Sequence, residues 1–265
     1  MLESAYDTVP GGGSLMLATY QWSLLWDYRS DFVRGLWIAL KVASVAMVLS
    51  ILFGILLAAA RMSKGPVSWL AVAYINVFRG IPALVSVIWV YFGWSLVLGI
   101  SFTVFQAAVL ALVALYSAFI AEIYRSALEA VPRGQREAGL ALGMSSLRVF
   151  VKITLPQATK IAVPNIGSML IGMVKDTSVF TIIGLVEVVR VTQNINSITF
   201  QPFVLYTGAA ALYVVAAFGI DFVFRAIEKS LSTPPQGRIA QLVHRRRRRR
   251  VERVVRDFQA EAGSV

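Results

Sequence analysis

Long apolar segments separated by short polar ones run along most of this chain. Charged residues are absent from four stretches: Val42–Ala60, Gly80–Ala121, Ile161–Val174 and Val191–Ile220. A helix needs roughly 20 apolar residues to cross a bilayer. The pattern therefore predicts an all-α integral membrane protein with five spanning helices, at about 36–60, 68–93, 103–124, 157–175 and 203–226.

Composition agrees with this fold class and excludes several functions. Of 265 residues, 57% are hydrophobic and 15% are charged, whereas soluble domains are roughly 25% charged. Cysteine is absent and His244, the only histidine, adjoins an arginine run, so we expect no metal site, cofactor or histidine-based catalysis. No Walker A phosphate loop is present either, and we expect a chain that is not itself an ATPase.

The distribution of lysine and arginine predicts the orientation. Basic residues gather between Arg125 and Lys160 and again from Arg225 onward, which places both regions and the C-terminus in the cytoplasm and the N-terminus outside. The first 30 residues carry acidic side chains and no basic leader, so we expect no cleavable signal peptide. The expected organisation is an extracytoplasmic segment at 1–30, a membrane domain at 31–230 and a basic cytoplasmic tail at 231–265.

The arginine-rich tail has two interpretations. It could bind RNA or DNA, but a solvated run that contacts anionic membrane lipid is favoured. Nucleic acid is therefore not an expected partner.

Small residues recur along two predicted spans, at Ala46, Ser50, Gly54 and Ala58 and at Ala107, Ala111, Ala114, Ala118 and Ala121. Such stripes let helix backbones approach closely in lipid. We favour helix contact inside one subunit over a subunit interface. Elsewhere, Glu122 is expected to contact Arg125 at a helix end, and Asp221 to pair with Arg225 along one helix face.

Residues 136–158 read as two short polar helices between membrane spans. Pro132 suits a helix start and Gly143 a left-handed helix stop, after which Ser145 or Ser146 could cap a second short helix through Leu155. The first helix carries little side-chain bulk and could enter a groove on a partner protein. From the residues alone, a loop that merely connects two spans is an equal alternative.

The same residues resemble the EAA loop of bacterial ABC importer permeases, whose pattern is EAA, three residues, G, nine residues and I-x-LP. This chain has Glu137-Ala138-Gly139, then Gly143, then Ile153-Thr154-Leu155-Pro156 at that spacing, with Gly139 in place of the second alanine. The stretches NVFRGIPALV (76–85), AEIYRSALEAVPRGQ (121–135) and KDTSVFTIIGLVEV (175–188) resemble the polar amino acid branch of that family.

The resemblance implies a type I importer permease in the bacterial inner membrane. Such a permease works with a second permease subunit, in a homodimer or heterodimer, with a dimer of cytoplasmic ATPases and with an extracytoplasmic amino acid-binding protein. The loop at 128–156 would be the coupling element that sits in the ATPase. Its expected contact residues are Glu137, Ala138, Gly139, Gly143, Ile153, Leu155 and Pro156.

Candidate substrate residues lie at two interruptions of the apolar pattern. Asp176 could bind the ammonium of an amino acid while Thr177 and Ser178 donate hydrogen bonds to its carboxylate. Alternatively, Lys175 and Asp176 lie at the water interface. Asn76 and Arg79 could also serve the carboxylate, or they could satisfy main-chain groups freed by Pro82.

The resemblance also bears on the cargo. Relatives that carry basic amino acids tend to have a carboxylate two turns before the Lys-Asp-Thr-Ser motif, where this chain has Met169. A neutral or acidic amino acid such as glutamine, glutamate or aspartate is therefore favoured. The alternatives are an ABC permease for another small polar solute, a secondary transporter, an ion channel and a membrane anchor for nucleic acid.

Overall fold

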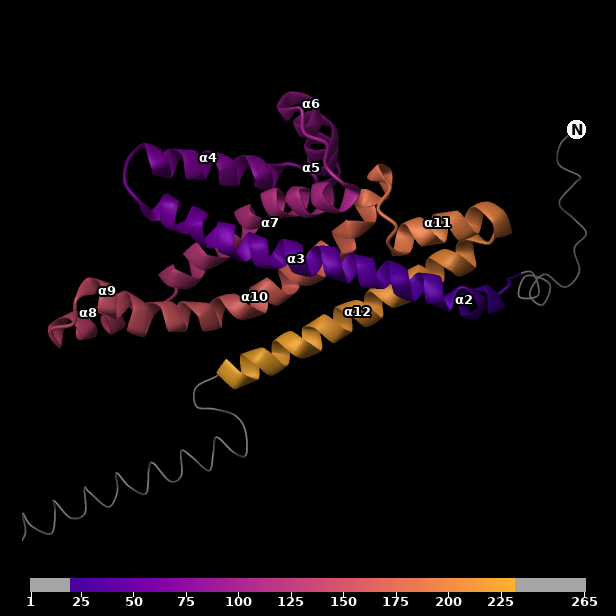
Figure 1. Ribbon diagram of the computed structural model, residues 1–265. Coiled ribbons are helices and arrows are strands. Elements are labelled where there is room, and N and C mark those ends of the chain that lie inside the picture. Colours follow the sequence, from indigo (N-terminus) through magenta and orange to yellow (C-terminus); the bar gives the residue numbers. More distant parts are fainter. Residues whose placement is uncertain (1–19, 232–265) are drawn as a thin grey trace, which may run out of the picture. The chain divides into compact units, whose positions relative to one another are not determined.

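The computed structural model describes residues 20–231, which are helical and contain no strand (Figure 1). The helices with their bounds are α2 (Ser23–Asp27), α3 (Arg29–Met62), α4 (Pro66–Gly80), α5 (Ala83–Ile88), η1 (Trp89–Trp94), α6 (Ser95–Leu98), α7 (Val104–Glu129), α8 (Arg133–Ala141), α9 (Ser146–Val149), η2 (Phe150–Thr154), α10 (Leu155–Asp176), η3 (Thr177–Ile183), α11 (Val188–Thr199) and α12 (Pro202–Leu231).

Four of the predicted spans are confirmed as long apolar helices. They are α3, α7, α12 and the continuous helical segment Ser146–Ile183, which contains α10. Helix α3 begins at Arg29, seven residues before the predicted start at 36, and so includes polar residues that the sequence pattern placed before the span.

The predicted second span, at about 68–93, is not one continuous helix but a bent pair of helices. The chain forms α4 and then α5, η1 and α6, with a bend of 111° between the two halves. Ile81 is extended, and Pro82 caps α5 with an extended ψ of 146°. Proline disfavours a helical conformation at the residue before it, which ends α4 at Gly80.

The prediction of a second short helix ending at Leu155 is wrong. The helix that starts at Ser146 continues through a π-helical turn, Phe150–Thr154, directly into α10. Pro156 lacks the N–H that an α-helix would pair with Lys152, and a turn with i→i+5 pairing absorbs this loss without breaking the helix. Ser145 is the N-cap residue as expected, but its side chain makes no capping hydrogen bond.

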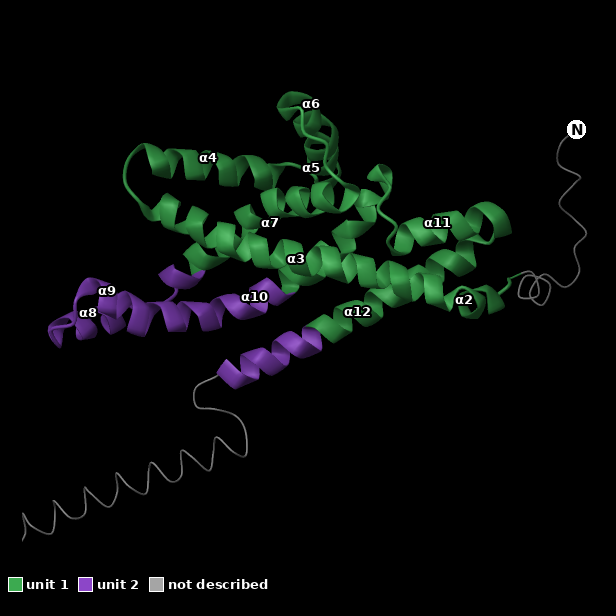
Figure 2. Ribbon diagram, viewed as in Figure 1, with its two compact units in different colours: residues 1–126, 168–220 green, residues 127–167, 221–265 purple. Residues whose placement is uncertain are grey.

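The described residues divide into two compact units (Figure 2). Unit 1 holds residues 20–126 and 168–220, and unit 2 holds 127–167 and 221–231. In unit 1, α4 runs back beside α3 (Figure 1). Leu57 and Ala58 of α3 pack there with Ile75 and Phe78 of α4 and with the alanines of α7.

The two small-residue stripes are buried inside unit 1, as expected for contact within one subunit. Ala46, Ser50 and Ala118 have no exposed surface. A Cβ at Gly54 would lie 2.6 Å from Ile120 Cγ2 and 3.0 Å from the Ser117 carbonyl oxygen. This close approach of α3 to α7 requires glycine.

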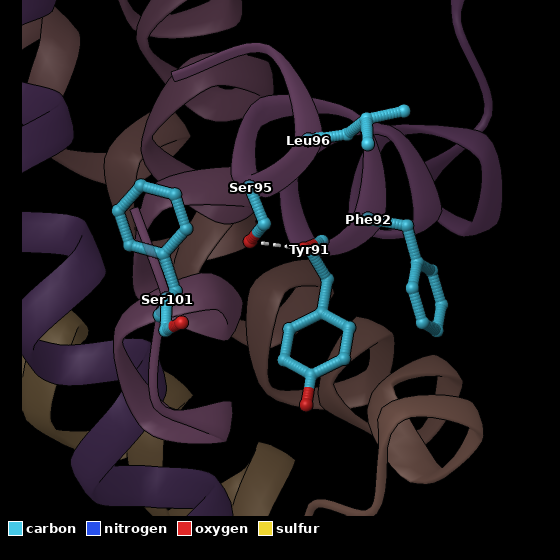
Figure 3. A pocket seen from close by; sticks show the side chains of 6 residues that line it. Tyr91, Phe92, Ser95, Leu96 and Ser101 are labelled. Carbon is cyan, nitrogen blue, oxygen red and sulfur yellow. Dashed lines mark hydrogen bonds between the residues drawn. The ribbon is translucent and has the colours of Figure 1, made fainter. Parts of the chain in front are cut away.

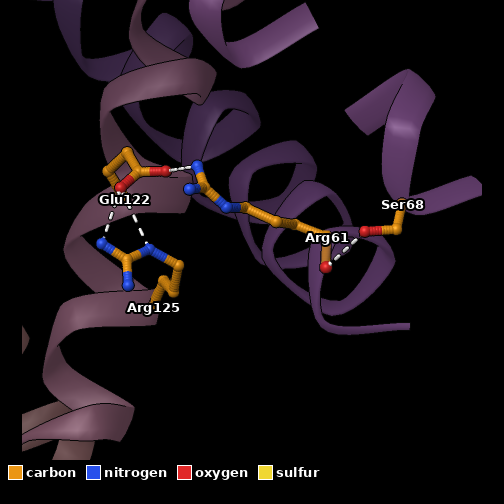
Figure 4. A network of polar contacts seen from close by, with 4 residues as sticks. All are labelled: Arg61, Ser68, Glu122 and Arg125. Atoms are coloured by element: carbon orange, nitrogen blue, oxygen red, sulfur yellow. Dashed lines mark hydrogen bonds and ion pairs between the residues drawn. The ribbon is translucent and has the colours of Figure 1, made fainter. Parts of the chain in front are cut away.

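A polar network joins α3, α4 and α7 at one end of these helices (Figure 4). Glu122 accepts hydrogen bonds from Arg125, at 3.1 Å from Nε, and from Arg61. Ser68 Oγ donates to the Arg61 carbonyl oxygen at 2.8 Å. The expected contact between Glu122 and Arg125 is confirmed, and Arg61 is the partner that local sequence did not reveal. In unit 2, Arg225 pairs with Asp221 at 2.6 Å as expected.

Helix α11 is fixed by a buried carboxylate. Glu187 has no exposed surface; its Oε1 accepts from the Arg190 main-chain N–H at 3.0 Å, and its Oε2 accepts from the Tyr213 hydroxyl at 2.5 Å. Burial raises the pKa of Glu187, while the hydrogen bonds from Tyr213 and the main chain lower it. Gly35 of α3 lies against this N-terminus, because a Cβ there would meet Val188 N at 2.9 Å.

Candidate functional site

The hairpin of unit 2 turns at Gly143, as predicted. Gly143 adopts a left-handed φ of 77°. Its N–H donates to the Leu140 carbonyl at 2.9 Å, and the N–H of Met144 donates to the Gly139 carbonyl at 3.2 Å. This pair of bonds is the Schellman arrangement that satisfies the carbonyls at a helix C-terminus. The turn therefore depends on a conformation that residues with a Cβ disfavour.

The residues predicted to couple to a partner divide between the inside and the outside of the hairpin. Gly139 is buried, and a Cβ there would lie 2.9 Å from both Ile153 Cδ1 and Val149 Cγ2. Glu137 and Ala138 are exposed, whereas Leu155 and Pro156 are the first residues of α10. Gly139 and Ile153 therefore hold α8 against η2, and Glu137 and Ala138 are available to a partner.

The tip of the hairpin exposes large apolar side chains. Leu142 is 83% exposed and Leu147 is 73% exposed. Leu140, Phe150 and Val151 are each at least 40% exposed. An apolar surface beside the charges of Arg136 and Glu137 is typical of a protein contact site.

Unit 1 contains a cavity of about 310 Å³ beside the bend between α4 and α5. Ile81 and Ala83 line it from the bend. Its other lining residues come from one face of α7 and one face of α10: Leu115, Tyr116, Phe119, Met169 and Asp176. The break in the second span therefore supplies part of the cavity wall.

Asp176 is the carboxylate among the residues that line this cavity. It is half-buried, and its Oδ2 accepts a hydrogen bond from the Tyr116 hydroxyl at 3.0 Å. Lys175 is exposed. A carboxylate in an otherwise apolar cavity, with a neutral donor on one oxygen, is suited to bind a cation.

The other predicted substrate residues lie in different surroundings. Thr177 is buried and donates to the Val174 carbonyl at 2.6 Å, and Ser178 donates to the Lys175 carbonyl at 2.7 Å. A hydroxyl has one proton to donate, so in this conformation both donors are engaged by the helix. Asn76 is exposed on α4.

Arg79 lies close to the cavity. Its guanidinium is 5.7 Å from the centre of the Phe119 ring, and Phe119 lines the cavity together with Asp176. Arg79 therefore lies against a residue of the cavity that Asp176 also lines, although the arginine and the aspartate are 97 residues apart in sequence.

A second cavity of about 410 Å³ lies around η1 and is lined by Tyr91, Phe92, Ser95, Leu96, Ser101 and Phe102 (Figure 3). Ser95 Oγ donates to the Tyr91 carbonyl at 2.6 Å. These six lining residues include no charged side chain, so this cavity is less suited to a charged ligand than the one at Asp176. Within residues 20–231, no group of three His, Asp or Glu side chains is placed to hold a metal ion.

Sequence reasoning did not find Tyr116, Phe119 or the aromatic cavity around η1. Tyr116 is 60 residues from its hydrogen-bond partner. Its only local signal is a polar aromatic residue within an alanine-rich span, which does not indicate what it contacts.

Comparison with known proteins gives a consistent result. Residues 50–233 match the family described as binding-protein-dependent transport system inner membrane component. The arginine transport system permease protein ArtQ of Bacillus subtilis (strain 168) is 33% identical over 205 residues, covering 76% of this chain and 92% of ArtQ. The glutamine transport system permease protein GlnP of Escherichia coli (strain K12) is 30% identical over 214 residues, covering 80% of this chain and 98% of GlnP.

A solved structure is similar as well. It is a crystal structure of an amino acid ABC transporter with histidines, with a TM-score of 0.75 and 32% identity. The match covers 80% of this chain and 99% of that one.

Proposed function

Because the chain belongs to the family of binding-protein-dependent transport system inner membrane components, we propose that it is the permease subunit of an ATP-driven importer for polar amino acids. A neutral or acidic amino acid such as glutamine, glutamate or aspartate is the favoured cargo. The chain supplies the path through the membrane, and a separate ATPase supplies the energy. The N-terminus lies outside and the basic tail, outside the described residues, lies in the cytoplasm.

The observation that carries this proposal is the cavity at the bend of the broken span. Asp176 and Met169 line it, and Arg79 lies over Phe119, which also lines it. A zwitterion would place its ammonium at Asp176 and its carboxylate toward Arg79. Half-helices that meet at an interruption are a common way to build a substrate site within a membrane.

The cargo preference follows from what lines the cavity. Among the relatives, ArtQ is named for arginine and GlnP for glutamine, and the similar crystal structure is named with histidines. In this chain Asp176 is the carboxylate among the lining residues, and it would be used by the α-ammonium. A cationic side chain would then share the site with the like-charged Arg79 and face Met169 and Leu115, which give it no counter-charge.

The hairpin of unit 2 would couple the permease to its ATPase. Glu137 and Ala138 are exposed beside the apolar tip, and Gly143 aims that tip. Gly139 and Ile153 act from the inside by holding α8 against η2. The other partners are a second permease subunit and an extracytoplasmic binding protein.

The experiment is ATP-driven uptake into proteoliposomes by the assembled complex, with its own binding protein. Radiolabelled L-glutamine, L-glutamate, L-aspartate, L-arginine and L-histidine are the probes. We expect one of the first three to be taken up best, and Asp176→Asn to raise its KM about tenfold or more, since hydrogen bonds to charged groups contribute about 1.5–3 kcal/mol.

Asp221→Asn is the matched control, because Asp221 pairs on an exposed helix face with Arg225. Best uptake of arginine or histidine would contradict the cargo assignment. Normal uptake by Asp176→Asn would remove Asp176 from the path.

A further inference from the structure

Tyr116 touches the candidate site in a way that the proposed function does not require. Its ring lines the cavity, the residue is 6% exposed, and its hydroxyl donates to Asp176 Oδ2 at 3.0 Å. One oxygen of the carboxylate is therefore occupied by a neutral donor before any ligand arrives. The Tyr116 oxygen retains its lone pairs, which can still accept.

Gly172 makes this contact possible. It lies one turn before Asp176 on α10, on the face that also carries Met169. A Cβ at position 172 would lie 3.1 Å from the Tyr116 hydroxyl oxygen. Such a separation is tighter than nine in ten contacts of real Cβ atoms, so alanine there would force the hydroxyl to move by a few tenths of an ångström.

We propose that Tyr116 is a specificity-determining residue that selects a primary ammonium group. With its proton donated to Asp176, the Tyr116 oxygen becomes a second acceptor beside the free carboxylate oxygen. A primary ammonium can donate one N–H to each acceptor in any of three rotations, whereas an N-methylated ammonium has only two N–H groups and its methyl group adds bulk beside the two acceptors. Gly172 is the positioning residue that leaves room for the hydroxyl. This inference rests on the proposed function, because it assumes that the ligand ammonium reaches Asp176.

The test compares Tyr116→Phe with wild type in the reconstituted complex. The probe is the amino acid that wild type takes up best, and its Nα-methyl derivative is the second substrate. The binding protein and the ATPase are the same in every sample, so a difference between permease variants originates in the permease. We expect the KM for the unmethylated probe to rise about two- to tenfold, the range for one lost hydrogen bond. The KM for the methylated derivative should change less, and Vmax should stay within about twofold of wild type.

Tyr74→Phe is the matched control. The Tyr74 hydroxyl is also partly buried in unit 1, donates to the Ala114 carbonyl at 2.9 Å and lies 3.2 Å from Ser117 Oγ. The Tyr74→Phe substitution removes a comparable hydrogen bond that only holds helices together. It should lower thermal stability without changing the ratio of the two KM values.

Gly172→Ala provides an independent variant. Alanine favours a helix by up to about 1 kcal/mol over glycine, so thermal stability should be retained while the KM for the unmethylated probe rises. Gly219→Ala is its control, because a Cβ at Gly219 meets nothing within 4 Å. Unchanged KM values in both Tyr116→Phe and Gly172→Ala would overturn the inference.

An equal rise for both substrates in Tyr116→Phe would also overturn it, because the hydroxyl would then only position Asp176. The outcomes separate the two proposals. If Asp176→Asn is impaired and Tyr116→Phe is not, only this inference fails. If Asp176→Asn is normal, the proposed site itself fails.

Discussion

Replacing Gly143 tests whether the orientation of the hairpin tip depends on the backbone conformation of this residue. The residue has a φ of 77°, and a Cβ there would meet nothing within 4 Å. Any effect inside the chain therefore comes from the backbone and not from a steric clash. Alanine in the left-handed region costs roughly 1–2 kcal/mol. Valine, which is branched at Cβ, should reach about 2–3 kcal/mol.

A cost of about 2 kcal/mol is nearly a thirtyfold shift toward other turn conformations. We therefore expect ATPase co-purification and ATP-driven uptake to be highest in Gly143→Asn, lower in Gly143→Ala and lowest in Gly143→Val. Asparagine should be close to wild type because it tolerates the left-handed region. Membrane abundance, measured by immunoblot, should stay near normal in all three.

Gly65→Val is the matched control for this series. Gly65 has a φ of 89° and equally open surroundings, but it lies in the turn between α3 and α4. At φ 89° and ψ −157°, Gly65 lies in a region essentially restricted to glycine, so valine there should carry at least as much backbone strain as at position 143 and leave ATPase co-purification intact. Normal coupling in Gly143→Val would show that the left-handed turn is not needed. A defect in Gly143→Asn as large as in Gly143→Val would show that the presence of a side chain, and not the backbone conformation, is decisive.

Three further predictions concern other parts of the chain. Gly35→Ala should destabilise the protein by about 1–3 kcal/mol, because the new Cβ would lie 2.9 Å from Val188 N. Its thermal midpoint in detergent should be lower than that of Gly219→Ala, and equal midpoints would contradict the packing of α3 on α11. The raised pKa of Glu187 means that its stability contribution is complete below the ordinary carboxyl range and is lost as pH rises through the folded-state pKa. Glu187→Gln should therefore flatten the pH dependence of the thermal midpoint, and an unchanged slope would oppose this. Deleting His244–Val265, outside the described residues, should leave uptake largely intact, and loss of the assembled transporter would contradict a tail that only contacts lipid.

The sequence predicted the features that depend on local pattern. Apolar length predicts the spans, since each helix must satisfy its own main-chain groups in lipid. The conformation of Gly143 follows similarly from a glycine that ends an amphipathic segment. The contact between Glu122 and Arg125 was predictable because the two residues are one turn apart.

The features that the sequence did not predict depend on geometry between distant residues. Pro82 was recognised as an interruption, but the 111° bend is a tertiary result. Pro156 was read as a helix end, whereas a π-helical turn carries the helix through it. Gly139 is predicted to contact a partner, and the sequence did not reveal its packing against Val149 and Ile153 of the same hairpin. Tyr116 and Tyr213 each meet a carboxylate that sequence spacing alone does not bring near.

We propose that this chain moves a solute only when a separate ATPase hydrolyses ATP. The most direct measurement is uptake of the radiolabelled amino acid panel into proteoliposomes, with the ATPase either present or omitted and with either ATP inside or an imposed proton or sodium gradient. We expect uptake only with the ATPase, ATP and the binding protein together. Uptake driven by an ion gradient without the ATPase would contradict it and would indicate a secondary transporter.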